Sequence, residues 1–123
     1  MTGGQMAPTT LLGQKTTTTP VGRLVERSGN PIKVSEMLAV LDGPSYIARV
    51  SVSSPKYIAR AKAAIKKAFQ MQLNGAGYAL VEVLSPCPTD WHMTPHQAIK
   101  WLEENMLPHY PLGEFKAPKE SQP

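Results

Sequence analysis

The stretch that decides the fold is residues 46–84, which read YIARVSVSSPKYIARAKAAIKKAFQMQLNGAGYALVEVL. Its first part, residues 46–52, alternates apolar with polar or small side chains and is rich in β-branched types, which predicts a strand. Ser54 then supplies a helix N-cap, and Pro55 takes the first helical position, where a proline is well tolerated. The stretch therefore begins with a strand that leads directly into a helix.

The helix that begins at Pro55 has one apolar stripe, because its apolar residues recur at helical spacing. The stripe, which we expect to form the core side of the helix, consists of Ile58, Ala61, Ile65, Ala68, Phe69 and Leu73. Asn74-Gly75 is a stop signal, and residues 78–84 form a mostly apolar run of strand length. We therefore predict two parallel strands joined by a right-handed helical crossover.

A second helix is predicted after the two strands. Thr94 is its expected N-cap, Pro95 its first residue, and Gln97 completes a capping box. Its expected buried stripe consists of Ala98, Ile99, Leu102 and Met106. Pro108 is expected to end the helix, and residues 108–123 are predicted to be an extended tail because they contain four prolines.

The chain upstream of residue 46 has little regular pattern. Residues 2–20 hold seven threonines and show no sustained period typical of a strand or a helix. We therefore predict that residues 1–30 form an irregular segment, which by itself is loop or disorder. A short helix is expected over residues 36–41, with Ser35 as its N-cap.

Composition limits the class of protein. The 123 residues suffice for one domain, and with 41% hydrophobic and 18% charged residues they do not match a disordered chain. One cysteine excludes an internal disulfide framework, and a net charge of +4 does not by itself indicate a polyanion partner. The sequence contains no apolar run of membrane-spanning length and no secretory signal, so we expect a cytoplasmic protein.

The predicted α/β core is small for a complete sheet. Its foldable part, residues 46–107, has about 60 residues, a size at which a single core is marginal. Two parallel strands also do not close a sheet, since parallel sheets need more strands and helices on both faces. Either further strands come from another chain, or residues 1–123 are a single partial domain of a larger protein.

Three stretches resemble one family, in the order in which that family has them. They are MTGGQMAPTT at residues 1–10, GQKTTTTP at residues 13–20 and SPCPT at residues 85–89. Together they resemble the C-terminal portion of the β subunit of 2-oxoacid:ferredoxin oxidoreductases, of the 2-oxoglutarate or 2-oxoisovalerate type. The resemblance implies a partial thiamine-diphosphate-binding fold, a parallel sheet flanked by helices, which agrees with the predicted crossover.

The resemblance also implies an activity and its partners. The family decarboxylates a 2-oxoacid oxidatively to an acyl-CoA, uses thiamine diphosphate, and passes electrons through iron–sulfur clusters to ferredoxin. Its other subunits, of the alpha, gamma and delta type, are the implied protein partners. In the family the ligands of Mg²⁺ and diphosphate lie upstream of the matching region, so we expect this chain to be inactive alone.

The resemblance implies that a cofactor and partner subunits order the irregular segment of residues 1–30, and it assigns the first residues to the cofactor pocket. The implied cofactor-binding residues are Met1, Thr2, Gly3, Gly4 and Gln5. The two glycines would let the backbone approach a ligand closely, while the threonine and glutamine offer hydrogen bonds. The alternative interpretation is a flexible N-terminal tail.

Cys87 is the candidate metal ligand. The resemblance implies that it is one of the four cysteines that hold a 4Fe–4S cluster in the intact family protein, and this chain supplies only that one. The alternative is a small buried thiol. Cys87, His92 and His96 also have the spacing C-x4-H-x3-H, which could form a mononuclear zinc site.

The predicted crossover helix carries a run of basic residues that supports a second hypothesis. The run consists of Lys56, Arg60, Lys62, Lys66 and Lys67. It is either a solvated helix face or a docking surface for a polyanion or an acidic protein such as ferredoxin. The alternatives to an enzyme are thus a non-catalytic basic binding module or an inactive remnant.

Four further residues have open roles. Trp91 and Trp101 are interpreted as packing residues rather than ligand platforms. Lys15 and Arg23 lie in an otherwise uncharged segment, where they could meet an acidic substrate or a coenzyme phosphate, or simply be solvated.

Overall fold

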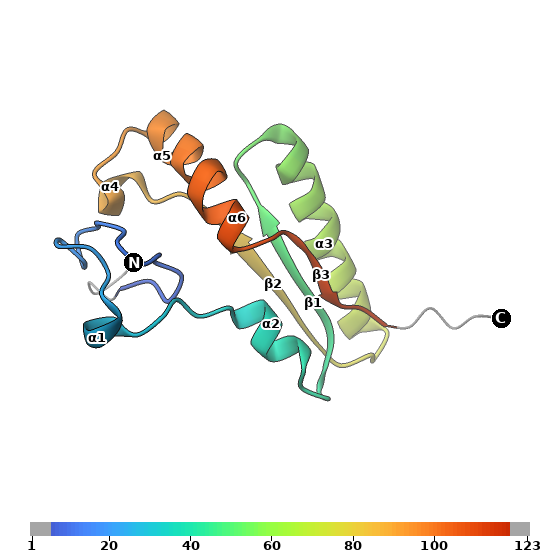
Figure 1. Ribbon diagram of the computed structural model, residues 1–123. Helices are drawn as coiled ribbons and strands as arrows, with labels where there is room; N and C mark the ends of the chain where they lie inside the picture. The colour runs from blue at the N-terminus through green and yellow to red at the C-terminus, as the bar shows by residue number, and fades with distance from the viewer. Residues whose placement is uncertain (1–5, 119–123) are drawn as a thin grey trace. The chain divides into compact units, whose positions relative to one another are not determined.

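A computed structural model describes residues 6–118, and within it the chain divides into two compact units (Figure 1). The loop unit comprises residues 6–33 and 86–109, and the sheet unit comprises residues 34–85 and 110–118. The predicted cofactor-binding residues 1–5 lie outside the described residues. Across residues 6–118, the structure contains no helix that is both long enough and apolar enough to cross a membrane.

The sheet unit contains the predicted strand, helix and strand. They are β1 (Pro44–Ser51), α3 (Pro55–Leu73) and β2 (Tyr78–Leu84), and β1 pairs with β2 in parallel. The N-cap prediction for α3 is confirmed, because the side chain of Ser54 accepts a hydrogen bond from the backbone N–H of Tyr57. The chain is therefore an α/β protein, as its sequence indicates.

A third strand corrects the prediction of an extended tail over residues 108–123. β3 (Gly113–Lys116) pairs antiparallel with β1, so the strand order is β2-β1-β3 and the sheet is mixed. The strand lies in a short proline-free run, and its alternating side chains find partners on β1. Glu114 accepts a hydrogen bond from Tyr46, and the ring of Phe115 lies 4.9 Å from the guanidinium carbon of Arg49.

The sheet is covered by a helix on each face (Figure 1). α3 packs against β1 and β2, and α2 (Val34–Ala39) packs on the opposite side. Ser35 is not the N-cap of this helix as predicted. The helix begins at Val34, so Ser35 lies within its first turn, fully buried, where its hydroxyl donates to Glu82 Oε2 at 2.5 Å.

The predicted burial of the apolar stripe on α3 is largely wrong. Ala61 is buried, but Ile65, Phe69 and Leu73 are 41%, 65% and 84% exposed. The stripe has the predicted helical spacing, yet the sheet beneath it ends at β2, which is an edge strand. A sheet of three strands is too narrow to cover a stripe of this width.

The loop unit begins with turns and a short helix. Between Leu12 and Arg23 the chain turns back on itself through isolated bridges, and α1 (Val25–Ser28) follows. Gly22 has a φ of +91°, and a side chain there would meet the carbonyl oxygen of Gly13 at 2.9 Å. Only glycine therefore fits at this close approach of the backbone.

The rest of the loop unit is a series of short helices: α4 (Pro88–Trp91), α5 (Pro95–Trp101), the π-helical segment η2 (Leu102–Met106) and α6 (Leu107–His109). The predicted capping box between Thr94 and Gln97 is confirmed, and Ala98, Leu102 and Met106 are buried. Pro108 does not end the helical run as predicted. A wider π turn precedes it, where a proline disturbs the α-helical hydrogen-bond ladder.

Candidate functional site

The loop unit brings residues 13–20, which the sequence singled out, against Asp90 and His92, which follow directly after the stretch of residues 85–89. The backbone N–H of Thr17 donates to the carbonyl of Asp90 at 2.9 Å, and the hydroxyl of Thr17 lies 3.4 Å from His92 Nε2. More than 70 residues separate these partners in the sequence, so residues 13–20 and the segment after Cys87 come together only in the folded chain.

The threonine run is a tight turn with satisfied hydroxyls. Thr16 and Thr19 are buried, and their hydroxyl oxygens lie 2.9 Å apart. The Thr19 hydroxyl also donates to the carbonyl of Gln14 at 2.8 Å. Gln14 is itself buried, and its side-chain oxygen accepts from the backbone N–H of Leu11 at 2.8 Å. These contacts tie the threonine hydroxyls to one another and to the neighbouring backbone.

Arg23 is neither solvated nor free to bind an acidic substrate or a coenzyme phosphate, which corrects both of its predicted roles. Arg23 is only 3% exposed. Its guanidinium donates five hydrogen bonds of 2.8–3.0 Å, to the backbone carbonyls of Pro8, Thr10, Ser28, Gly29 and Asn30. Arg23 therefore organises the loop that surrounds it.

A cleft of 410 Å³ lies within the loop unit, and Lys15, Trp91 and Trp101 are among its lining residues. The two indole rings pack against each other edge to face with centroids 5.0 Å apart, as predicted, but both also line the cleft, so packing is only part of their placement. Lys15 is exposed at this cleft. The arrangement combines an aromatic wall with one cation, which suits a ligand that has an apolar part and an anionic part.

Cys87 stands immediately before α4, where its carbonyl accepts from the backbone N–H of Trp91 at 3.0 Å. Its thiol is free and half-buried. The predicted zinc site with His92 and His96 is not assembled, since the described chain contains no group of three or more potential metal ligands. His92 instead has a left-handed φ of +55° and lies beside Thr17. Cys87 thus remains as a single free, half-buried thiol.

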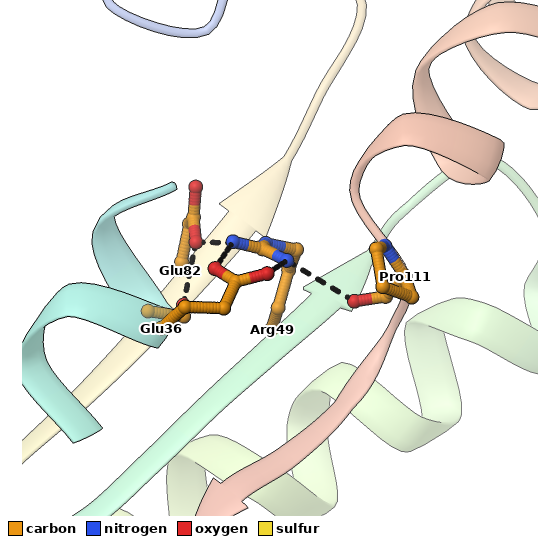
Figure 2. Close-up of polar contacts among 5 residues, drawn as sticks. Glu36, Arg49, Glu82 and Pro111 are labelled. Carbon is orange, nitrogen blue, oxygen red and sulfur yellow. Dashed lines mark hydrogen bonds and ion pairs between the residues drawn. The ribbon is translucent and has the colours of Figure 1, made fainter. Parts of the chain in front are cut away.

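The sheet unit contains a buried ionic centre that the sequence interpretation missed (Figure 2). The side chain of Arg49 is fully buried and donates to Glu36 Oε2 at 2.5 Å and to Glu82 Oε2 at 2.8 Å. It also donates to the carbonyl of Pro111 at 3.2 Å. Figure 2 shows these partners converging on the guanidinium from α2, from β2 and from the segment before β3.

The electrostatics of this centre favour the charged arginine. Burial alone would lower the pKa of Arg49, but the hydrogen bonds and negative charges of Glu36 and Glu82 raise it above the ordinary value. The rings of Tyr110 and Phe115 lie 5.1 and 4.9 Å from the guanidinium carbon. All these contacts join elements of the sheet unit, so the centre is structural. The sequence feature that could have predicted this ionic centre is a charged residue in the middle of each predicted strand, at Arg49 and Glu82.

A second polar group lies on the α3 side of the sheet, beside a cavity of 310 Å³. Tyr46 donates to Glu114 Oε1 at 2.8 Å, and Lys67 Nζ approaches both oxygens of Glu114 at 2.8 and 2.9 Å. Lys67, one of the five basic residues of α3, is therefore neutralised rather than available for a polyanion. Lys56, Arg60, Lys62 and Lys66 are exposed.

This polar group changes the titration of two of its members. Burial raises the pKa of Tyr46 well above its ordinary value, and the hydrogen bond and charge of Glu114 raise it further. Burial also raises the pKa of Glu114, but the hydrogen bonds from Lys67 and Tyr46 outweigh this and leave the pKa below its ordinary value.

Comparison with known proteins gives relatives that match nearly the whole chain. The ketoisovalerate oxidoreductase subunit VorA of Methanothermobacter thermautotrophicus is 48% identical over 94% of this chain. The 2-oxoglutarate synthase subunits KorB of Archaeoglobus fulgidus and Methanocaldococcus jannaschii are 42% and 37% identical over 85% and 87% of it. Neither a protein-family model nor a solved structure matches significantly.

The match covers a limited part of each relative. This chain spans 24% of VorA and 35% or 37% of the two KorB subunits. The relatives are nonetheless of the type that the three sequence stretches indicated, and they align over almost all of the chain. The predicted resemblance is thereby confirmed: the chain is homologous to a part of the VorA and KorB subunits of the 2-oxoacid:ferredoxin oxidoreductase family.

Proposed function

We propose that this chain is a portion of a 2-oxoacid oxidoreductase subunit and works only as part of a larger enzyme. The observation that carries the proposal is the 48% identity to VorA over 94% of the chain. The contacts between Thr17 and the segment after Cys87 support it, because they bring one motif-bearing stretch against the residues that directly follow another.

The proposed reaction is the oxidative decarboxylation of a 2-oxoacid with coenzyme A. The bond between the carboxylate and the 2-oxo carbon breaks, carbon dioxide leaves, and the thiol sulfur of coenzyme A bonds to the remaining acyl carbon. Each turnover releases one proton and two electrons, and two oxidised ferredoxin molecules take one electron each. The acyl carbon is thereby oxidised, and charge balances between the two sides.

The cofactor chemistry divides between this chain and the rest of the enzyme. Bound thiamine diphosphate would supply the electron sink that decarboxylation needs. Because the family holds Mg²⁺ and the diphosphate upstream of the matching region, we assign the Mg²⁺ ligands to the part of the enzyme outside this chain. From this chain, Thr2 and Gln5 would donate hydrogen bonds to the cofactor or substrate, and Gly3 and Gly4 would let the backbone come close.

Lys15 is the cation of this chain that we place near an anionic group. It is exposed at the cleft that Trp91 and Trp101 line, whereas Arg23 is buried and fully engaged. An ammonium group there would hold a carboxylate or a phosphate of the substrate or the coenzyme by charge, without a fixed geometry.

Cys87 would supply one of the four thiolates of a 4Fe–4S cluster, with the other three from outside the chain. Its free, half-buried thiol fits that role. In a hybrid VorA that carries this chain in place of the homologous segment, we expect Cys87→Ser to lower the bound iron and visible absorbance. Thr89→Ser, a change at an exposed neighbour, should leave both unchanged. Equal iron in the two variants would contradict the assignment.

The same hybrid tests the proposed activity. It is assembled with the other subunits of the Methanothermobacter ketoisovalerate oxidoreductase, and reduction of a one-electron dye is followed with ketoisovalerate or 2-oxoglutarate. We expect reduction that depends on both a 2-oxoacid and coenzyme A. VorA without the homologous segment is the control and should be inactive. An assembled, folded hybrid that reduces no dye with either 2-oxoacid would contradict the proposal.

A further inference from the structure

The cavity on the α3 side of the sheet, here called the α3–β3 cavity, has one wall that the sequence did not predict. Its volume is 310 Å³, and it lies within the sheet unit between α3, β1 and β3 (Figure 1). Leu112, Gly113 and Glu114 form the unpredicted wall, in a segment for which the sequence indicated an extended tail. The cavity shares no lining residue with the cleft of the loop unit to which the proposed function assigns Lys15.

The strand side of the α3–β3 cavity is buried and mainly apolar. Tyr46, Ala48 and Val50 of β1 line it and are at most 7% exposed. They are spaced two apart, so they lie on the same face of the sheet, the face that α3 covers. A volume of roughly 300 Å³ is at the lower end of the range for small-molecule sites, and such sites are mainly apolar with a few polar groups.

The helix side of the α3–β3 cavity is not the apolar stripe of α3. Its lining residues are spaced three or four apart and therefore follow one side of the helix: Tyr57, Arg60, Ala63, Ala64 and Lys67. The two alanines in the middle of this side are short, which leaves space between the helix and β3. Arg60 lines the cavity and is also exposed, so it lies where the cavity opens to solvent.

The α3–β3 cavity carries one positive charge that no carboxylate compensates. Lys67 Nζ lies 2.8 and 2.9 Å from the two carboxylate oxygens of Glu114, so these two groups neutralise each other. Arg49 also lines the cavity, but its charge is met by the two carboxylates of the buried ionic centre. Within residues 6–118, no acidic side chain forms an ion pair with Arg60, whose guanidinium carbon lies 6.0 Å from the centre of the Tyr57 ring.

We propose that the α3–β3 cavity binds a small organic carboxylate that has an apolar body. The apolar body would lie against Ala48 and Val50, and Arg60 would donate two parallel hydrogen bonds to the carboxylate at the opening. One uncompensated guanidinium suits a monoanion. A phosphate monoester carries close to two negative charges and would need a second free cation, which Lys67 does not supply. This site lies beyond the proposed function and does not rest on it.

The binding test uses 4-fluorobenzoate as the probe and follows its ¹⁹F NMR signal in a titration with the full 123-residue chain. We expect saturable binding of one molecule per chain. 4-Fluorobenzyl alcohol has the same ring without the charge, and acetate has the charge without the ring. Each of these should bind about tenfold more weakly than 4-fluorobenzoate. No saturable binding of 4-fluorobenzoate, or equal affinity for 4-fluorobenzoate and the alcohol, would overturn the proposal.

Three variants test whether the probe binds in this cavity. Arg60→Met should weaken binding of 4-fluorobenzoate about tenfold. Lys62→Met removes an exposed charge of α3 outside the cavity and should leave binding unchanged. Ala64→Leu fills the space between helix and sheet and should weaken binding of both 4-fluorobenzoate and the alcohol. Equal affinities for Arg60→Met and Lys62→Met would overturn the proposal, as would binding that Ala64→Leu leaves unchanged.

Hydrogen exchange adds a local readout, because a molecule in the cavity would contact α3, β1 and the segment of β3 together. β3 is short and pairs only with β1, so we expect 4-fluorobenzoate to slow exchange of the backbone amides of residues 112–116. Residues 95–101, in the loop unit, should exchange at the same rate with and without the probe. Unchanged exchange over residues 112–116 at a saturating concentration of the probe would overturn the proposal.

Urea unfolding of the wild-type chain and of each variant shows whether the chain folds cooperatively without the rest of the enzyme. If it does not, the same titrations are made with the hybrid VorA complex, and the same differences between probes and between variants are expected. A hybrid whose affinity for 4-fluorobenzoate is equal in the wild-type, Arg60→Met and Ala64→Leu forms would overturn the proposal.

Discussion

At the scale of single residues, two buried arginines have different structural roles. Arg23 donates to five backbone carbonyls and so fixes the path of a loop. Arg49 pairs with two carboxylates and so joins helix and strands through their side chains. For Arg23 the sequence suggested a ligand contact or a solvated side chain, but the side chain is buried.

Loss of the Arg49 side chain should strongly destabilise the sheet unit. Arg49→Met leaves the carboxylates of Glu36 and Glu82 without their cation, and breaking a buried pair in this way costs about 3–5 kcal/mol. Urea unfolding measures the change in the free energy of unfolding. Arg60→Met removes an exposed arginine from α3 and should cost about 0.5 kcal/mol or less. Similar values for the two variants would contradict the assigned role of Arg49.

Glu114 should make the chain less stable in acid. The pKa of Glu114 lies below its ordinary value in the folded chain, so its contribution is present above the unfolded-state pKa and is lost as pH falls through the folded-state pKa. Urea midpoints at about pH 7 and about pH 3 measure the effect. We expect Glu114→Gln to lose less stability between these values than the wild-type chain. Glu103→Gln, at an exposed position, should behave as wild type, and a Glu114→Gln loss as large as wild type would count against the account.

At the scale of elements, local signals predicted the regular parts well. The strand, helix and strand of residues 46–84 and the cap at Ser54 follow from short-range pattern alone. β3 was missed because a four-residue strand near prolines has no measurable period. The exposure of Phe69 was missed for another reason: helical spacing identifies an apolar side, but the width of the sheet decides how much of it is covered.

Residues 8–30, the loop around Arg23, should become less ordered when the guanidinium of Arg23 is removed. Arg23→Met leaves five carbonyl acceptors without their donor, including those of Pro8 and Asn30 at the two ends of the loop. Hydrogen exchange, read by mass spectrometry, should show faster exchange across residues 8–30 while β1 keeps its protection. Arg27→Met, which changes an exposed arginine of α1, is the matched control and should have no such effect. Unchanged exchange in Arg23→Met would show that the hydrogen bonds do not hold the loop.

At the scale of the whole molecule, the described chain is two small units with an unprotected sheet edge, and it spans a quarter of the length of VorA. The sequence motifs identified the family, and folding joins residues 13–20 to the segment after Cys87. The contact from Thr17 to Asp90 could not be predicted, because no local pattern records a pairing across that separation. The cofactor role of residues 1–5 and the cluster role of Cys87 stay predictions.

The most direct measurement of the central claim is the initial rate of dye reduction by the hybrid VorA complex. The rate is compared with that of the parent complex and of the complex whose VorA lacks the homologous segment. The account expects the hybrid to restore reduction that requires both ketoisovalerate or 2-oxoglutarate and coenzyme A. A hybrid that assembles and melts cooperatively like the parent, yet is no faster than the complex without the segment, would contradict it.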